Sequence, residues 1–270
     1  MKLSLALLSI TLAAGSLARA QEAAGDRVVV PVRNTTHPRK VDASLMHGSI
    51  TVKSYAGKEV IVEARGSSGS SPDKGDRTVE GLKRLDFPAR GLTVEEEDNV
   101  VTVRMNMNSG RSGDVVISVP ADTSLKLHTL HGEISVEGVH GELEVDSLNG
   151  AVTLANVSGT VVAHSLNGAI KASMDSVDST KPLSFSTLNG SIDVTLPADF
   201  KANVKLTTDH GEIYSDFDFK MGGSITQRND TSDGKFRINI DRTLTGSING
   251  GGAEATFHTF NGRIYIRKKK

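Results

Sequence analysis

Residues 125–168 read LKLHTLHGEISVEGVHGELEVDSLNGAVTLANVSGTVVAHSLNG, and this stretch decides the fold. Five of its glycines recur every nine residues, at Gly132, Gly141, Gly150, Gly159 and Gly168. A repeat this short cannot bury an apolar face by itself, so successive repeats have to stack on one another. The pattern therefore predicts a stacked, repetitive architecture.

Every second glycine ends a four-residue motif, Ser/Thr-Leu-Asn/His-Gly, so two nine-residue units make one 18-residue coil. Apolar and polar residues alternate after each turn, as where Ile134 and Val136 flank Ser135. Alternation at period two indicates strands with one buried face. We expect the Leu of each motif to point inward as well. The fold class predicted is all-β, a single-domain parallel β-solenoid.

The Asn-Gly or His-Gly pair recurs along the whole chain. Glycine, and to a lesser degree asparagine, tolerates the left-handed backbone region that a tight corner uses. We therefore expect positive φ at Gly150 and Gly168. The predicted structural turn residues are His47, Gly48, His131, Gly132, Asn149, Gly150, Asn167, Gly168, Asn189, Gly190, His210, Gly211, Asn261 and Gly262. Asn-Gly is also a strong hairpin signal, so an antiparallel β-sandwich is the alternative fold.

The first twenty residues resemble a secretory signal peptide. Lys2 precedes the apolar run from Leu3 to Leu12, and Ala18-Arg19-Ala20 has the form of a cleavage site before Gln21. No other stretch approaches the roughly 18–20 apolar residues of a membrane span. We expect an exported protein, periplasmic or secreted, with no transmembrane segment in the mature chain. Residues 21–270 would form one solenoid domain with a flexible insertion near 65–90.

Composition narrows the function classes. The chain has no cysteine, which excludes disulfides and thiolate metal sites. Its formal charge of −1 becomes −3 when Lys2 and Arg19 are removed with the leader, which argues against nucleic acid as a partner. Aromatic residues make up 4% and tryptophan is absent, which weakens a lectin or polysaccharide-lyase interpretation.

The Leu-Asn-Gly-x-Ile pattern, following the strand end Ile117-Ser118-Val119-Pro120, resembles a bacterial envelope family that carries the label "putative adhesin". The resemblance covers roughly Val28 to Ile266. It implies an all-β, solenoid-like exported domain and offers no catalytic residues to carry over. This sequence departs from the pattern by placing histidine at His47, His131, His140 and His210, and by the long insertion around residues 66–90.

One set of residues could hold a metal. His128, Asp146 and His164 share a register and would lie on three successive coils, and two imidazoles with a carboxylate are reasonable ligands for zinc. The alternative, which we favour, is an exposed strand position where polar residues face water.

Four carboxylates, Glu133, Glu142, Glu144 and Asp146, could supply the pair that glycoside hydrolysis requires. A solvated acidic face is the interpretation we favour for them. Motifs of catalytic nucleophiles and phosphate loops are missing from the sequence. We predict no catalytic residue, no cofactor and no metal.

The sequence thus favours a non-enzymatic exported envelope protein. It would present a repetitive polar solenoid surface to an envelope protein, a polysaccharide or another copy of itself. One alternative is a polysaccharide-acting β-helix enzyme. Another is an accessory protein of an envelope-stress or regulatory system.

Overall fold

The computed structural model describes residues 26–31, 38–66, 92–105, 113–222, 227–230, 237–240 and 243–270. The predicted signal peptide at 1–20 lies outside the described residues. So does the predicted insertion near 65–90, apart from Arg65 and Gly66.

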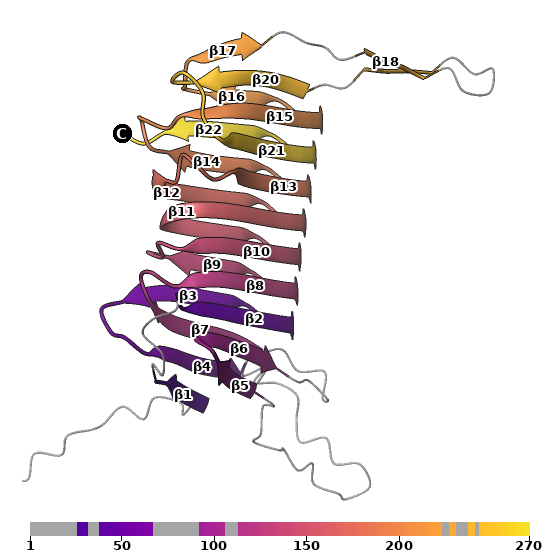
Figure 1. The fold of residues 1–270 in the computed structure, drawn as a ribbon. Coiled ribbons are helices and arrows are strands. Elements are labelled where there is room, and N and C mark those ends of the chain that lie inside the picture. Colours follow the sequence, from indigo (N-terminus) through magenta and orange to yellow (C-terminus); the bar gives the residue numbers. More distant parts are fainter. Residues whose placement is uncertain are drawn as a thin grey trace, which may run out of the picture.

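Two sheets face each other along the molecule, and each coil contributes one strand to each (Figure 1). In spatial order, sheet B contains β5 (Leu92–Glu97), β6 (Val100–Met105), β2 (Lys40–His47), β8 (Ser124–His131), β10 (Glu142–Asn149), the second half of β11 (Val152–Asn167), β13 (Leu183–Asn189), β21 (Glu254–Asn261), β15 (Ala202–His210), β20 (Thr243–Ile248) and β17 (Phe219–Gly222).

Sheet A contains β1 (Asp26–Val30), β4 (Val60–Gly66), β7 (Gly113–Pro120), β3 (Ile50–Tyr55), β9 (Ile134–Glu137), the first half of β11, β12 (Ile170–Val177), β14 (Ile192–Leu196), β22 (Ile264–Lys268) and β16 (Ile213–Ser215). Two further strands, β18 (Gln227–Asp230) and β19 (Arg237–Ile240), pair only with each other among the described strands.

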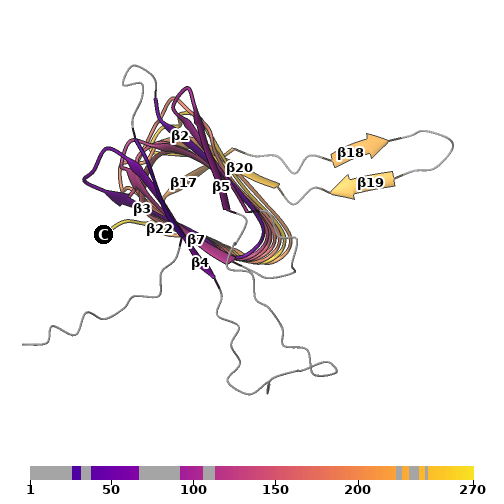
Figure 2. The same ribbon diagram turned by 90° about the horizontal axis from the view of Figure 1, so that it is seen from below.

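Successive coils pair in parallel with the register that the repeat predicts. Leu143 lies beside Leu125 on one side and Val161 on the other, each 18 residues away. Burial alternates along the strands, so the inward residues of both sheets form one apolar core. Seen along the axis, the coils superpose around that core (Figure 2). The predicted all-β parallel solenoid is confirmed, and antiparallel pairing in its two sheets is confined to the two ends.

The coils do not stack in the order of the chain. The first coil, β2 and β3, lies between the coil of β6 and β7 and the coil of β8 and β9. The last coil, β21 and β22, lies between the coil of β13 and β14 and the coil of β15 and β16. The 21-residue spacing from Gly190 to Gly211 is as long as one coil with a small loop, so the sequence alone would make Asn189 and His210 neighbours. The structure instead inserts Asn261 between Asn189 and His210.

Antiparallel strands extend three of the four sheet ends. At the N-terminal end of the stack, β5 adds to β6 in sheet B, while β4 and then β1 add to β7 in sheet A. At the other end, β20 and then β17 add to β15 in sheet B. In sheet A, β16 is the last described strand.

Candidate functional site

The Ser or Thr that opens each repeat motif lies inside the solenoid. These hydroxyls belong to Thr129, Ser147, Ser165, Thr187, Thr208 and Thr259, and all six residues are buried. Each hydroxyl donates to the carbonyl oxygen of the corner glycine on the neighbouring coil, over 2.9 to 3.3 Å. A buried hydroxyl needs such a partner. The first position of the motif therefore joins adjacent coils at the corner.

The corner glycines form a column in which each backbone packs on the next. A Cβ added to Gly150 would lie 2.5 Å from the carbonyl carbon of Gly132 and closer still to its oxygen. The expected positive φ at Gly150 and Gly168 is wrong, because neither residue lies in the left-handed region, unlike Gly48 with φ of 129°. Glycine is required at these two positions by the close approach of backbones rather than by the backbone angle.

The Asn or His of each motif points outward at the corner, and these side chains form one continuous column. Along the axis, the corner ladder runs through His47, His131, Asn149, Asn167, Asn189, Asn261 and His210. The amide nitrogen of Asn167 donates to Asn149 at 2.9 Å, and Asn189 and Asn261 repeat the bond at 2.8 Å. The rings of His47 and His131 stack 4.9 Å apart. At this end of the ladder, stacking of histidine rings therefore takes the place of the hydrogen bonds between asparagine side chains.

The Leu of each motif faces outward, so the expectation that it points inward is wrong. Strand alternation decides this, because the preceding Ser or Thr takes the inward position. Leu148 and Leu188 are 36% and 40% exposed, and Phe260 and Met46 at the same position are 39% and 54% exposed. With the half-buried Leu130 and Leu166, these residues form an apolar row beside the corner ladder, which we call the Leu row: Met46, Leu130, Leu148, Leu166, Leu188 and Phe260.

The structure brings His128, Asp146 and His164 together on three adjacent strands of sheet B. Asp146 lies between the two imidazoles, with its carboxylate oxygens 3.5 Å from His128 Nδ1 and 3.2 Å from His164 Nδ1. His164 Nδ1 is within hydrogen-bond distance of the carboxylate, and His128 Nδ1 faces it from the other side. Among the described residues no group of three His, Asp or Glu side chains is arranged to hold a metal ion.

Replacing His128 with alanine should change the free energy of unfolding by no more than about 0.5 kcal/mol, because the side chain is exposed and its contact with Asp146 is at the surface. Chemical denaturation of the purified chain measures this. Elemental analysis of the same samples is the control, since stoichiometric zinc lost on His128→Ala would show that the column is a metal site.

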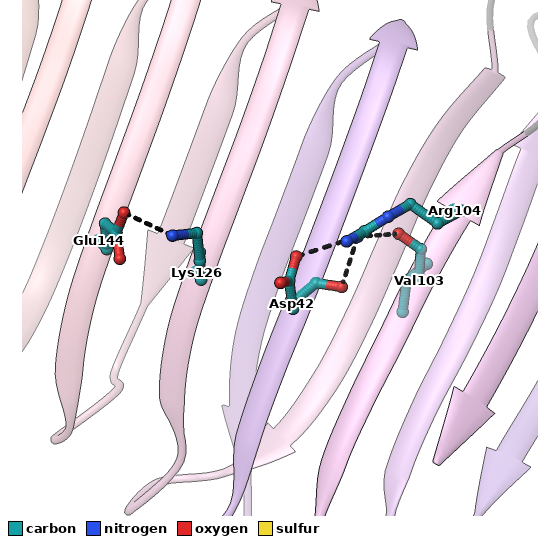
Figure 3. A network of polar contacts seen from close by, with 5 residues as sticks. All are labelled: Asp42, Val103, Arg104, Lys126 and Glu144. Carbon is teal, nitrogen blue, oxygen red and sulfur yellow. Dashed lines mark hydrogen bonds and ion pairs between the residues drawn. The ribbon is translucent and has the colours of Figure 1, made fainter. Parts of the chain in front are cut away.

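Three of the four candidate carboxylates are engaged by basic or imidazole groups. Glu142 pairs with Lys181 at 2.5 Å, Glu144 with Lys126 at 2.8 Å, and Asp146 with the two histidines. Glu144 accepts a hydrogen bond from Lys126 and thereby raises the pKa of that lysine. Figure 3 shows this pair beside Asp42 on the adjacent strand β2; the side chain and the backbone carbonyl of Asp42 accept hydrogen bonds from Arg104 on β6. The arrangement alternates charges along the sheet rather than converging two acids on one point.

Sequence reasoning missed an aromatic cluster on the outer face of sheet A. Tyr214 and Tyr265 stack with ring centroids 5.3 Å apart, and the Arg267 guanidinium lies 5.2 Å from the Tyr265 ring centre. Arg267 also contacts the Asp193 carboxylate through two bonds of 2.7 and 3.2 Å. The signal was present, because each tyrosine stands three residues after a motif glycine, Gly211 or Gly262.

No helix that could span a membrane occurs in the described part of the chain. A family model described as Toastrack DUF4097 matches residues 27–243. No curated protein matches the chain.

The solved structures that are similar to the chain include two from bacteria. One is a "putative cell adhesion protein" from Clostridium sporogenes, at 10% identity and a TM-score of 0.42, covering 91% of this chain and 100% of that one. The other is a "putative adhesin" from Bacteroides fragilis, at 11% identity and a TM-score of 0.40, covering 92% of this chain and 98% of that one.

Proposed function

The chain belongs to the Toastrack DUF4097 family, and we propose that it is a non-enzymatic exported envelope protein that binds a partner protein across the outer face of sheet B. The observation that carries the proposal is the Leu row, an exposed apolar line beside the corner ladder. Export is supported by the signal-like sequence of residues 1–20.

The Leu row has the properties of a binding surface. It crosses six neighbouring coils, and at one strand spacing per coil its length is about 24 Å. Soluble proteins rarely leave contiguous apolar patches exposed unless the patch binds something. The backbone beneath it is fixed by parallel pairing on both sides, so little chain ordering opposes binding.

The chemistry of the row favours a protein over a polysaccharide. Its exposed members are aliphatic or thioether side chains, with Phe260 the one aromatic residue among them. Sugar rings are commonly bound on aromatic faces, whereas aliphatic rows bury well against complementary protein side chains. The paired charges of Glu142, Glu144 and Asp146 add a polar border to such an interface.

The test is a pull-down from envelope extract with the mature chain and the double variant Leu148→Ser/Leu188→Ser as baits. We expect the double variant to lose the captured partner while keeping its fold, since both side chains are exposed. The matched control is Val29→Ser, which removes a side chain of similar exposure, 43%, from β1 in sheet A. Equal capture by wild type and the double variant would contradict the proposal.

A further inference from the structure

The two sheets end unequally at the C-terminal end of the stack (Figure 1). Strands β15 and β16 belong to the same coil, but sheet B continues past β15 with β20 and then β17. Among the described strands, β16 pairs only with β22. Sheet B therefore extends past sheet A by two strands, about 10 Å.

Core positions are left uncovered beside this extension. Ile213 is half-buried and Ser215 is exposed, whereas Ile264 and Ile266 at the same positions of β22 are 0% and 1% exposed. Leu244, an inward residue of β20, is 42% exposed. A hollow of about 190 Å³ lies between the sheets here, lined by Val204, Leu206, Ile213, Ser215, Phe219, Leu244, Thr245 and Gly246.

One edge of β16 faces this hollow without a neighbouring strand among the described residues. On the other edge, β22 donates to the carbonyl oxygen of Glu212 at 3.0 Å and accepts from the amide of Asp216 at 3.3 Å. Backbone groups of successive residues alternate between the two edges of a strand. Ile213 and Ser215 therefore turn their N–H and C=O groups to the uncovered edge.

The uncovered position in sheet A lies opposite Leu244. The corner between β15 and β16 follows His210, and Leu206 and Ser215 lie at matching distances on either side of it. Leu244 is the partner of Leu206 on the next strand of sheet B, so a strand added beside Ser215 would face Leu244. After Asp216 the chain crosses to β17 in sheet B, so the uncovered edge is the short strand β16 alone.

The other end of the stack shows what fills such a position. Strand β1 runs in the direction of β7 and β16, because β1 and β7 are both antiparallel to β4. Val28 of β1 pairs with Val62 of β4, which pairs with Ile117, and Ile117 begins the inward column of sheet A that ends at Ser215. An antiparallel strand thus completes the core beside β1, and its inward residues are no more than 1% exposed: Val60, Val62 and Ala64.

We propose that β16 binds an extended segment of another protein as an added antiparallel strand. The backbone of the segment would pair with Ile213 and Ser215, and its inward side chains, aliphatic like those of β4, would fill the hollow against Leu244. Strand addition at an exposed sheet edge is a recurring mode of peptide recognition. The site is separate from the Leu row, which lies on the outer face of sheet B.

The outward side chain that the segment places beside Tyr214 is expected to be basic. Tyr214 is 46% exposed and is flanked along the chain by the exposed carboxylates of Glu212 and Asp216. On the neighbouring strand, the Arg267 guanidinium already lies 5.2 Å from the ring centre of Tyr265. An arginine or lysine of the segment would contact the Tyr214 ring in the same way.

A folded second copy does not match the uncovered position. At the N-terminal end, sheet A carries two added strands, β4 and β1, and sheet B carries one, β5. Sheet A therefore extends past sheet B by one strand at that end, whereas the C-terminal end requires two. A free extended segment meets no such restriction.

The direction of the backbone groups gives a specific test. Residues directly opposite each other in an antiparallel pair lie on the same face and are either both hydrogen-bonded or both not. Ile213 and Ser215 are inward residues that face the uncovered edge, so the inward residues of the added strand must donate to β16. N-methylation of an inward residue of the segment removes such a bond, and N-methylation of an outward residue does not.

The probe is a fluorescein-labelled synthetic peptide with the sequence of residues 59–65 carrying Glu63→Arg, which supplies the basic outward residue. Fluorescence polarisation with the purified mature chain should show saturable binding. N-methylation of the peptide at Val62 should weaken binding about tenfold or more, because a bond is lost and the methyl group meets the strand edge. N-methylation at Ile61, the matched control, should leave binding unchanged.

Variants of the chain locate the site. Leu244→Asp should weaken binding about tenfold or more, because its carboxylate would be buried without a partner against the peptide. Val29→Asp, which changes a side chain of similar exposure at the other end, should bind like wild type. Leu148→Ser/Leu188→Ser should also bind like wild type, so this test is independent of the Leu row.

Three results would overturn the proposal. The first is the absence of saturable binding to the wild-type chain. The second is an equal effect of N-methylation at Val62 and Ile61, which would show apolar contact without strand pairing. The third is a wild-type chain that sediments as a dimer and becomes monomeric in Leu244→Asp, which would place a second copy at this end of the stack.

Discussion

Alanine in place of Gly150 is expected to lower the free energy of unfolding by about 3 kcal/mol or more, the upper range for an overpacked core. The added Cβ would overlap the backbone carbonyl of Gly132, which cannot rotate away as a side chain can. That carbonyl also accepts the hydroxyl of Ser147, so moving it disturbs the hydrogen bond that joins the two coils. Chemical denaturation of the purified mature chain measures the change.

Gly250→Ala separates the two reasons for which a glycine can be required. Gly250 has φ of 92° and no atom within 4 Å of an added Cβ, so alanine there meets backbone strain without a clash. Left-handed strain costs about 1–2 kcal/mol. We expect Gly150→Ala to be the more destabilising substitution. The close packing of corner backbones would be disproved if Gly250→Ala cost as much or more.

The sequence was sufficient to predict the single coil because the information for it is local. Alternation in Leu143, Val145 and Ser147 defines the buried face, and the 18-residue recurrence defines which residues become neighbours. The same alternation, carried one residue further, places Leu148 outside. Apolar character alone suggested the opposite, and that error hid the Leu row.

The order of the coils could not be predicted in the same way. Asn189, His210 and Asn261 carry equivalent turn motifs, so any of these coils can follow any other by pattern alone. One specific signal does exist inside the core. Among the described strands of sheet B, Phe185 and Phe257 are the only phenylalanines at this inward column position, which Ala163, Val145 and Leu206 occupy on other coils. The two rings stack 5.4 Å apart. Neighbouring coils are matched by side-chain size.

The candidate site was predicted in part. The register brought His128, Asp146 and His164 to adjacent strands, and the structure has them in contact. The unequal end of the two sheets, where β20 and β17 extend sheet B past β15 while β16 is the last described strand of sheet A, could not be predicted from the sequence, because it depends on which strands follow β15 in space. Ser215 occupies the register position that Ile266 and Val194 occupy on the preceding coils, where both are buried. A polar residue at this core position is the sequence signal of the unequal end.

Phe257→Ala tests the insertion of the C-terminal coil. Phe257 is 0% exposed and packs between the coils of β13 and β15, so its truncation should cost about 3–5 kcal/mol. Phe260→Ala is the matched control, because it removes the same side chain from the same strand on the exposed face and should cost about 0.5 kcal/mol or less. Denaturant unfolding of both variants gives the two free energies.

Hydrogen exchange then locates the damage. Because β21 pairs with both β13 and β15, Phe257→Ala should speed amide exchange in residues 183–189 and in residues 202–210, while strands such as β8 keep their protection. If the coils instead followed the order of the chain, β13 and β15 would pair directly and β21 would lie at an end of the stack. The loss of protection would then reach only one of the two strands. Faster exchange on both sides of the substituted coil is the result that the interleaved order requires.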